Sequence, residues 1–229
     1  MRKKSKTRLE DVADAAIACF IDMGFRRTQM TDIAKRAGTS AGTLYLYVES
    51  KEALLSLALM RAAGKSLEDL TVPVETPDIS NTIEETRQTV LELAKLPVMD
   101  KMLDQKSVTD RDIYALADEL YTLLVTQRHA ILLLDQLSRD IEAFNTLHAE
   151  NARGHYLNGL ASILSKAYPD AKIGQLRIIA RTAIEAIAWT AMHRQRHESA
   201  AYSYDVTEEE ARHAGLTAFV GILRSAANL

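Results

Sequence analysis

The chain has 229 residues, of which 47% are hydrophobic, and a formal net charge of −3. This length and composition allow a buried core in one or two domains and exclude the intrinsically disordered class. Abundant Ala and Leu, with only nine Gly and four Pro, favour helices, so we expect an all-α protein.

No apolar run reaches the roughly 18 residues that a membrane-spanning helix needs. The basic start resembles the front of a signal peptide, but Glu10, Asp11 and Asp14 interrupt what would be its apolar core. The single cysteine, Cys19, forms no internal disulfide, which fits a reducing compartment. We therefore expect a cytoplasmic protein without a membrane partner.

The charge is unevenly distributed along the chain. Residues 1–51 hold 10 Lys+Arg and 6 Asp+Glu, whereas the remainder holds 18 and 25. A basic head on an acidic body is typical of a phosphate-binding module, although chance clustering in a terminal segment produces the same pattern.

The first predicted helix runs from Leu9 to Met23, because apolar residues recur there with the spacing of one helical face. Gly24 is expected to end it. Cys19 lies at the edge of the apolar face, where a small buried thiol is a simpler interpretation than a redox sensor.

A second helix is predicted to begin near Thr28 or Gln29, with the Thr28 hydroxyl accepting a hydrogen bond from its first turn. Gly38 can adopt the left-handed conformation that ends this helix, and Ser40 can cap the next one. The connecting turn of about three residues has the spacing of a helix-turn-helix motif.

On the third helix, Leu44 and Val48 are predicted to face inward together with Ala41. The outward face then consists of Gly42, Thr43, Tyr45 and Leu46, with Tyr47 at its margin. This face carries no charge, and its hydroxyls can donate to phosphates or base edges. The alternative is that the two tyrosines pack against neighbouring helices.

Ser50 is expected to cap a fourth helix that begins at Lys51 and extends to about Leu70. A lysine and free backbone amides then share one helix N-terminus, which predicts a phosphate site.

Residues 8 to 60 resemble the TetR-type bacterial transcriptional regulators. Several spaced motifs carry this resemblance, in the family's order: AAIACF, Gly24, IAKRAGTS, GTLY and SKEALL. It implies DNA contacts by Thr43, Tyr45, Tyr47 and Lys51, with Gly42 where the backbone approaches DNA closely.

The sequence departs from the family pattern on the side that faces DNA. Thr31, Gln29, Ala41 and Leu46 replace residues that are frequently more polar, basic or aromatic. Without Arg or Lys on the third helix, the bidentate contact to guanine cannot come from it, so we expect readout by hydroxyls and by Leu46 against thymine methyls.

We expect phosphate attraction to come mainly from basic residues around this helix. These include the arm at residues 2–8, Lys35 and Arg36. The residues predicted to contact DNA are Arg26, Arg27, Thr28, Gln29, Thr31, Ser40, Gly42, Thr43, Tyr45, Leu46, Tyr47 and Lys51.

Residues 71–81 hold two prolines and several turn formers, and we expect a break there. A helix from Asn81, paired with Glu84 in a capping box, to about Leu96 is predicted to end at Pro97. Further helical patterns cover residues 111–137, 141–167, 171–196 and 208–226. We therefore divide the chain into a helix-turn-helix domain at 1–51 and a helical-bundle regulatory and dimerisation domain at 52–229.

The last two helical patterns carry stripes with many small residues. These stripes are Ile173, Leu176, Ala180, Ala183, Ile184, Ile187 and Ala191 in one pattern, and Ala211, Ala214, Ala218, Ile222 and Ser225 in the other. They permit close helix approach, so two such hairpins can form a four-helix interface, which is also the homodimer contact that the resemblance implies. Alternatively, the stripes complete the core of one chain.

The resemblance also implies a small-molecule effector, on whose identity the sequence gives little information; no other cofactor is expected. Candidate lining residues are Tyr114, Tyr121, His148, Asn151, His155 and Trp189, although core packing or a solvated face explains them as well. His193 and His197 have the spacing of metal ligands, but the neighbouring Arg194 and Arg196 disfavour a cation, so no metal site is predicted.

The sequence therefore predicts a ligand-responsive repressor that binds a palindromic double-stranded operator as a homodimer. A DNA-organising protein without a ligand shares the same head and differs in lacking a pocket. A helical carrier or an enzyme is the remaining alternative, but no nucleophile elbow, phosphate loop or metalloprotease motif is found.

Overall fold

The computed structural model describes residues 9–194 and 205–228, and in these ranges the protein is all-α, as predicted. The chain divides into two compact units. One comprises the residues up to Leu93 together with His129–Asn151, and the other comprises Ala94–Arg128 together with the residues from Ala152 onward. This division does not test the predicted boundary between a helix-turn-helix domain at 1–51 and a regulatory domain at 52–229, which stays a prediction.

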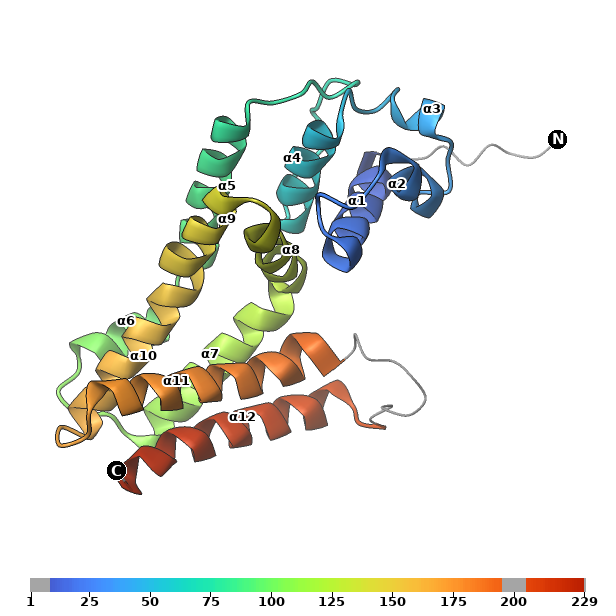
Figure 1. Cartoon of the computed structure of the whole chain (residues 1–229). Coiled ribbons are helices and arrows are strands. Elements are labelled where there is room, and N and C mark those ends of the chain that lie inside the picture. Colours follow the sequence, from blue (N-terminus) through green and yellow to red (C-terminus); the bar gives the residue numbers. More distant parts are fainter. Residues whose placement is uncertain (1–8, 195–204, 229) are drawn as a thin grey trace. The chain divides into compact units, whose positions relative to one another are not determined.

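The first unit begins with four helices, α1 (Leu9–Met23), α2 (Met30–Arg36), α3 (Ala41–Leu44) and α4 (Lys51–Ala62) (Figure 1). α1 packs against both α2 and α4, and α2 packs against α3. Phe20, Leu44 and Leu54 are fully buried between them. Val48 is also buried, so the predicted inward pair Leu44 and Val48 is confirmed.

The same unit contains α5 (Ile79–Leu93), α9 (Glu142–Leu147) and most of α8 (Arg128–Asp140). The segment at 71–81, predicted as a break, is tied back to the head. Val74 N–H donates to the Tyr47 carbonyl at 2.8 Å and Glu49 N–H donates to the Val74 carbonyl at 3.0 Å, forming an isolated parallel bridge. Thr76 Oγ1 donates to Ser50 Oγ at 2.8 Å, which anchors the segment beside the start of α4.

The second unit contains α6 (Pro97–Asp104), α7 (Asp110–Thr126), α10 (Gly154–Ala167), α11 (Ile173–Ala188) and α12 (Glu208–Arg224). A π-helical segment at His148–Arg153 leads into α10, and a second one at Trp189–His193 follows α11. A 3₁₀ turn at Ser225–Asn228 follows α12. α11 and α12 lie side by side as a hairpin (Figure 1).

Close backbone approach and capping define this second unit. A Cβ on Gly159 of α10 would lie 2.8 Å from Met99 Sδ, so glycine allows α10 to pack closely on α6. Glu119 accepts hydrogen bonds from the N–H groups of Val98 and Met99, at 2.8 and 3.2 Å, and thereby satisfies the start of α6. Thr207 and Glu210 form a capping box that fixes the start of α12.

Several predicted helix limits were wrong. α4 ends at Ala62, well before Leu70, and Gly64 follows with a φ of 75°. α5 begins at Ile79, two residues before the predicted start at Asn81. The side chain of Asp78, and not that of Asn81, accepts the hydrogen bond from Ser80 N–H at the start of this helix. Pro97 begins α6, since the first position of a helix needs no donor there.

The long pattern predicted for 111–137 is two helices that part at Gln127. The hydrophobic period continues through this break, and for that reason it could not be located from the sequence.

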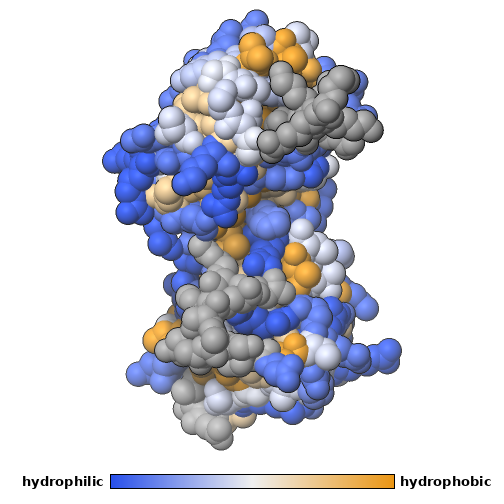
Figure 2. Space-filling model, turned by 90° about the vertical axis from the view of Figure 1, so that its right-hand side faces the viewer, coloured by the Kyte–Doolittle hydropathy of each residue, from blue (hydrophilic) through white to orange (hydrophobic). Residues whose placement is uncertain are grey.

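Within the described residues, no helix is long and apolar enough to cross a membrane. On the face in Figure 2, apolar residues form small separate patches among hydrophilic ones.

Candidate functional site

The turn between α1 and α2 positions the basic residues of the head. Gly24 has a φ of 86°, which ends α1 as predicted. The Thr28 side chain is only 1% exposed, and its hydroxyl is 2.7 Å from the Gly24 carbonyl and 3.3 Å from the Cys19 carbonyl. Thr28 therefore holds the turn closed, and the predicted roles of capping α2 and contacting DNA do not fit this buried position.

Lys51 braces the same turn from the start of α4. Its Nζ donates to the carbonyls of Phe25 at 3.0 Å and Thr28 at 3.2 Å, and it lies 4.5 Å from the centre of the Phe25 ring. Two of its three donors are thus used inside the head, so a phosphate contact would use the third. Ser50 Oγ accepts from Ala53 N–H at 3.1 Å, which confirms the predicted cap of α4.

Asp140, at the end of α8, contacts the other side of this turn, and no sequence pattern indicated this contact. Its Oδ2 accepts from Arg26 N–H at 3.2 Å. A Cβ at Gly24 would lie 2.7 Å from the same oxygen, so the close approach depends on glycine.

α2 and α3 form the predicted helix-turn-helix. Gly38 has a φ of 67°, and Ser40 Oγ accepts from Thr43 N–H at 3.1 Å, so both predicted turn residues are confirmed in these roles. Gln29, which precedes α2, is exposed and donates its N–H to Asp32 Oδ2 at 2.8 Å. α3 is shorter than predicted, because the chain leaves the helix after Leu44 and turns into the bridge at Val48.

The outward face of this motif is exposed and uncharged. Leu46 is 68% exposed and Tyr45 51%, Thr31 and Gly42 are also exposed, and Thr43 and Tyr47 are half-buried. Ser40 Oγ and Thr43 Oγ1 lie 2.9 Å apart, so one hydroxyl already donates to the other. Most of the predicted DNA-contacting residues are thus accessible to solvent, and their contacts with DNA stay a prediction.

Exposed cations lie on α2 and on the turn that precedes it. Arg26, Arg27 and Lys35 are exposed. Arg27 Nε donates to the Met23 carbonyl at 2.8 Å, which fixes its direction, while Arg36 forms a 2.7 Å ion pair with Asp22 that neutralises it. The arm at residues 2–8 lies outside the described residues. Arg26, Arg27 and Lys35 therefore remain exposed, and their contacts with phosphate stay a prediction.

Cys19 is buried in α1, and burial raises the pKa of its thiol despite the nearby Arg36 guanidinium. A protonated, inaccessible thiol reacts poorly, which favours the packing interpretation.

The residues predicted to line a ligand site do not form a single cluster in either unit. In the second unit, Tyr121 is buried and donates to Glu208 Oε1 at 3.1 Å, whereas Tyr114, His155 and Trp189 are exposed. His148 is buried in the first unit, and the side chain of Asn151 lies outside the described part of the structure. Their assignment to a pocket stays a prediction.

Tyr156 was not singled out from the sequence. It lies beside His155 on α10, with ring centres 5.8 Å apart, and burial raises the pKa of its phenol to about 12. His197, one of the two histidines with the spacing of metal ligands, lies outside the described residues. Within the described ranges, no group of three or more His, Cys, Asp or Glu side chains is placed to hold a metal ion.

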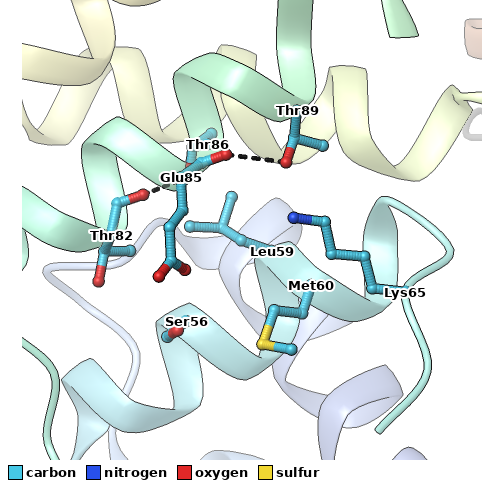
Figure 3. Close-up of a pocket in the computed structure, with 8 residues that line it drawn as sticks. All are labelled: Ser56, Leu59, Met60, Lys65, Thr82, Glu85, Thr86 and Thr89. Atoms are coloured by element: carbon cyan, nitrogen blue, oxygen red, sulfur yellow. Dashed lines mark hydrogen bonds between the residues drawn. The ribbon is translucent and has the colours of Figure 1, made fainter. Parts of the chain in front are cut away.

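A groove lies between α4 and α5 in the first unit, with a volume of about 290 Å³ that includes the part open to solvent (Figure 3). It is lined by Ser56, Leu59, Met60, Lys65, Thr82, Glu85, Thr86 and Thr89. None of these residues was predicted to bind anything, because exposed threonines and charged residues on a helix have no signature in the sequence.

The profile of the family described as bacterial regulatory proteins, tetR family, matches residues 12–58. The chain is also similar to the fatty acid metabolism regulator protein of Bacillus subtilis (strain 168), with 32% identity over 66 residues. That match covers 29% of this chain and 34% of the relative, so it concerns about a third of that relative's length.

Two solved structures have a similar fold over nearly the whole chain. A TetR-like transcriptional regulator from Rhodococcus sp. RHA1 has 17% identity and a TM-score of 0.50, covering 99% of each chain. The ketosteroid transcriptional regulator KstR2 of Mycobacterium tuberculosis has 15% identity and a TM-score of 0.51, covering 95% of each chain. The helix-turn-helix geometry and the family match together show that residues 12–58 are a head of the tetR family of bacterial regulatory proteins.

Proposed function

We propose that the protein is a cytoplasmic transcriptional regulator, a repressor that a small molecule releases from a palindromic operator. In this proposal residues 1–51 bind DNA, and residues 52–229 dimerise and respond to the ligand. The observation that carries it is the exposed, uncharged face of α3 with exposed arginines beside it. Such a surface is poorly suited to packing inside one chain and well suited to the major groove.

Attraction and sequence discrimination are assigned to different residues. Arg26, Arg27 and Lys35 attract phosphates, which gives affinity for any sequence and a steep salt dependence. Tyr45 and Leu46 contact base edges, Tyr45 through its hydroxyl and Leu46 through contact with thymine methyls. Gly42 lets the backbone approach the groove.

An exposed face of the α11–α12 hairpin supports dimerisation. This face contains only some of the residues of the predicted stripes. Ala180, Ala183 and Ala211 are buried within the unit and complete its own core. The outward residues with helical spacing are Ile178, Thr182 and Glu185 on α11 with Trp189 directly after it, and Ala214, Ala218 and Gly221 on α12 with Ser225 directly after it. Ile178 is 69% exposed, and the small residues of α12 let a second hairpin approach closely.

A two-fold dimer presents two copies of α3 to two half-sites roughly one helical turn of DNA apart, which predicts a palindromic operator. A ligand that prefers one spacing of the two heads shifts the population away from the DNA-binding form. The similarity to the fatty acid metabolism regulator covers 29% of this chain, so it does not assign that protein's ligand to the body.

Selection from a pool of random double-stranded DNA tests this proposal. The full chain should enrich a palindrome whose half-sites contain thymines, with binding that weakens steeply as salt rises. Ala substitutions at Tyr45 and Leu46 should abolish the enrichment while leaving weak, salt-dependent binding. Uniform recovery of all sequences by the unmodified protein would refute the regulator and favour a DNA-organising role.

A further inference from the structure

The groove between α4 and α5 combines charges and hydroxyls that the DNA-binding function does not use. One wall comes from α4 and the other from α5, and both helices belong to the first unit. The cavity itself holds about 30 Å³, and the larger figure of about 290 Å³ includes space that is open to solvent. A bound molecule therefore has to be small and stays partly in contact with water.

The hydroxyls of the α5 wall present acceptors to the groove. Thr82 Oγ1 donates to the Asp78 carbonyl at 3.3 Å, Thr86 Oγ1 to the Thr82 carbonyl at 2.6 Å, and Thr89 Oγ1 to the Glu85 carbonyl at 2.8 Å. A hydroxyl has one hydrogen, so each of these donors is already used and only lone pairs remain. This wall therefore complements a group rich in N–H donors.

Two opposite charges line the groove without pairing. In the described part of the chain, neither Glu85 nor Lys65 forms an ion pair. In Figure 3 the Glu85 carboxylate points toward Ser56, and the Lys65 ammonium points into the groove on the other side of Leu59. Leu59 and Met60 provide an apolar surface on the α4 wall. The groove thus has an anionic end, an apolar middle and a cationic end.

We propose that this groove binds a small zwitterion of the amino-acid class, with an ammonium group and a carboxylate separated by a short methylene chain. Glu85 and the hydroxyls of Thr82 and Thr86 hold the ammonium group. Lys65 holds the carboxylate, and the methylenes lie on Leu59. Charge-assisted hydrogen bonds at both ends select this class over molecules with a single charge.

The position of the groove connects it to the head. α4 begins at Lys51, whose Nζ holds the carbonyls of Phe25 and Thr28 beside the exposed Arg26 and Arg27. A ligand that joins α4 to α5 therefore acts on the helix that fixes this turn. The regulatory consequence, release of DNA, rests on the proposed function, whereas ligand binding does not.

Isothermal titration calorimetry of the full chain without DNA tests the site, with γ-aminobutyrate and ε-aminocaproate as probes. At least one should bind saturably, and butyrate and butylamine should bind at least tenfold more weakly because each lacks one charge. Glu85→Gln and Lys65→Gln should each weaken binding at least tenfold. Glu92→Gln and Lys95→Gln, at other exposed positions, are the matched controls and should leave binding unchanged.

The proposal is overturned if neither zwitterion binds, or if Glu85→Gln and Lys65→Gln bind as the unmodified protein does. Circular dichroism of each variant checks that the helical fold is retained. Because the titration contains no DNA, a failure to select an operator refutes the proposed function and leaves this site to be judged by calorimetry alone.

Discussion

Replacing Gly24 by alanine tests how the DNA-binding head is held on the rest of its unit. Gly24 has a φ of 86°, and a Cβ there would lie 2.7 Å from Asp140 Oδ2 and 3.0 Å from Gln136 Nε2. Gly38 is the matched control, since its φ is 67° and a Cβ there meets nothing within 4 Å. Both substitutions introduce left-handed strain, but only Gly24→Ala displaces the carboxylate that accepts from Arg26 N–H.

The left-handed conformation costs an alanine about 1–2 kcal/mol, and this cost applies to both variants. Loss of the Arg26 hydrogen bond to Asp140 adds about 0.5–1.5 kcal/mol in Gly24→Ala. We therefore expect Gly24→Ala to lower the free energy of unfolding by about 1.5–3.5 kcal/mol, and Gly38→Ala by about 1–2 kcal/mol.

Urea unfolding followed by circular dichroism measures both costs. In an Asp140→Ala background the carboxylate is absent, so the cost of Gly24→Ala should fall to that of Gly38→Ala. Equal costs for the two glycine variants in the unmodified protein would refute the role assigned to Asp140.

Three further predictions concern buried or exposed single residues. Thr28→Val removes the hydroxyl that bonds the Gly24 and Cys19 carbonyls, so it should cost about 1–2 kcal/mol in urea unfolding. The folded variant should still bind the selected operator, and normal stability with lost DNA binding would show instead that Thr28 contacts DNA. Burial raises the pKa of Cys19, so the folded protein should not react with Ellman's reagent near pH 8 until it is unfolded in urea; rapid native reaction would contradict this. Ile178→Glu should convert the dimer to monomer in sedimentation velocity while the exposed control Arg177→Glu should not, and a dimer that survives Ile178→Glu would place the interface elsewhere.

The head was largely predictable because its local signals agree with one another. The apolar period of α1, the left-handed glycines at 24 and 38, and the serine caps at 40 and 50 each fix a boundary through short-range chemistry. The exposure of Gly42, Tyr45 and Leu46 was also predicted, although the helix ends at Leu44.

The failures arose where a distant residue determines the role. Thr28 has the chemistry of a cap, but the Gly24 and Cys19 carbonyls take its hydroxyl, and Asp140 reaches the turn from 114 residues away. Ala180 and Ala183 belong to a small-residue stripe, and both are buried in the core of their own unit. The side of the hairpin that faces this core depends on packing with other helices, which the stripe alone does not indicate. The α4–α5 groove likewise depends on two helices that have no shared motif.

The most direct measurement of the proposed division between attraction and discrimination is a fluorescence-anisotropy titration over a range of salt concentrations. It compares the selected operator with a scrambled duplex of equal length. Arg27→Ala should weaken binding to both duplexes and reduce the salt slope by about 0.9. Leu46→Ala should keep the slope and lower the preference for the operator by about 1 kcal/mol for each thymine contact. If Arg27→Ala lost only specificity, or Leu46→Ala left discrimination intact, the assignment of attraction to the flanking cations and of sequence reading to α3 would be contradicted.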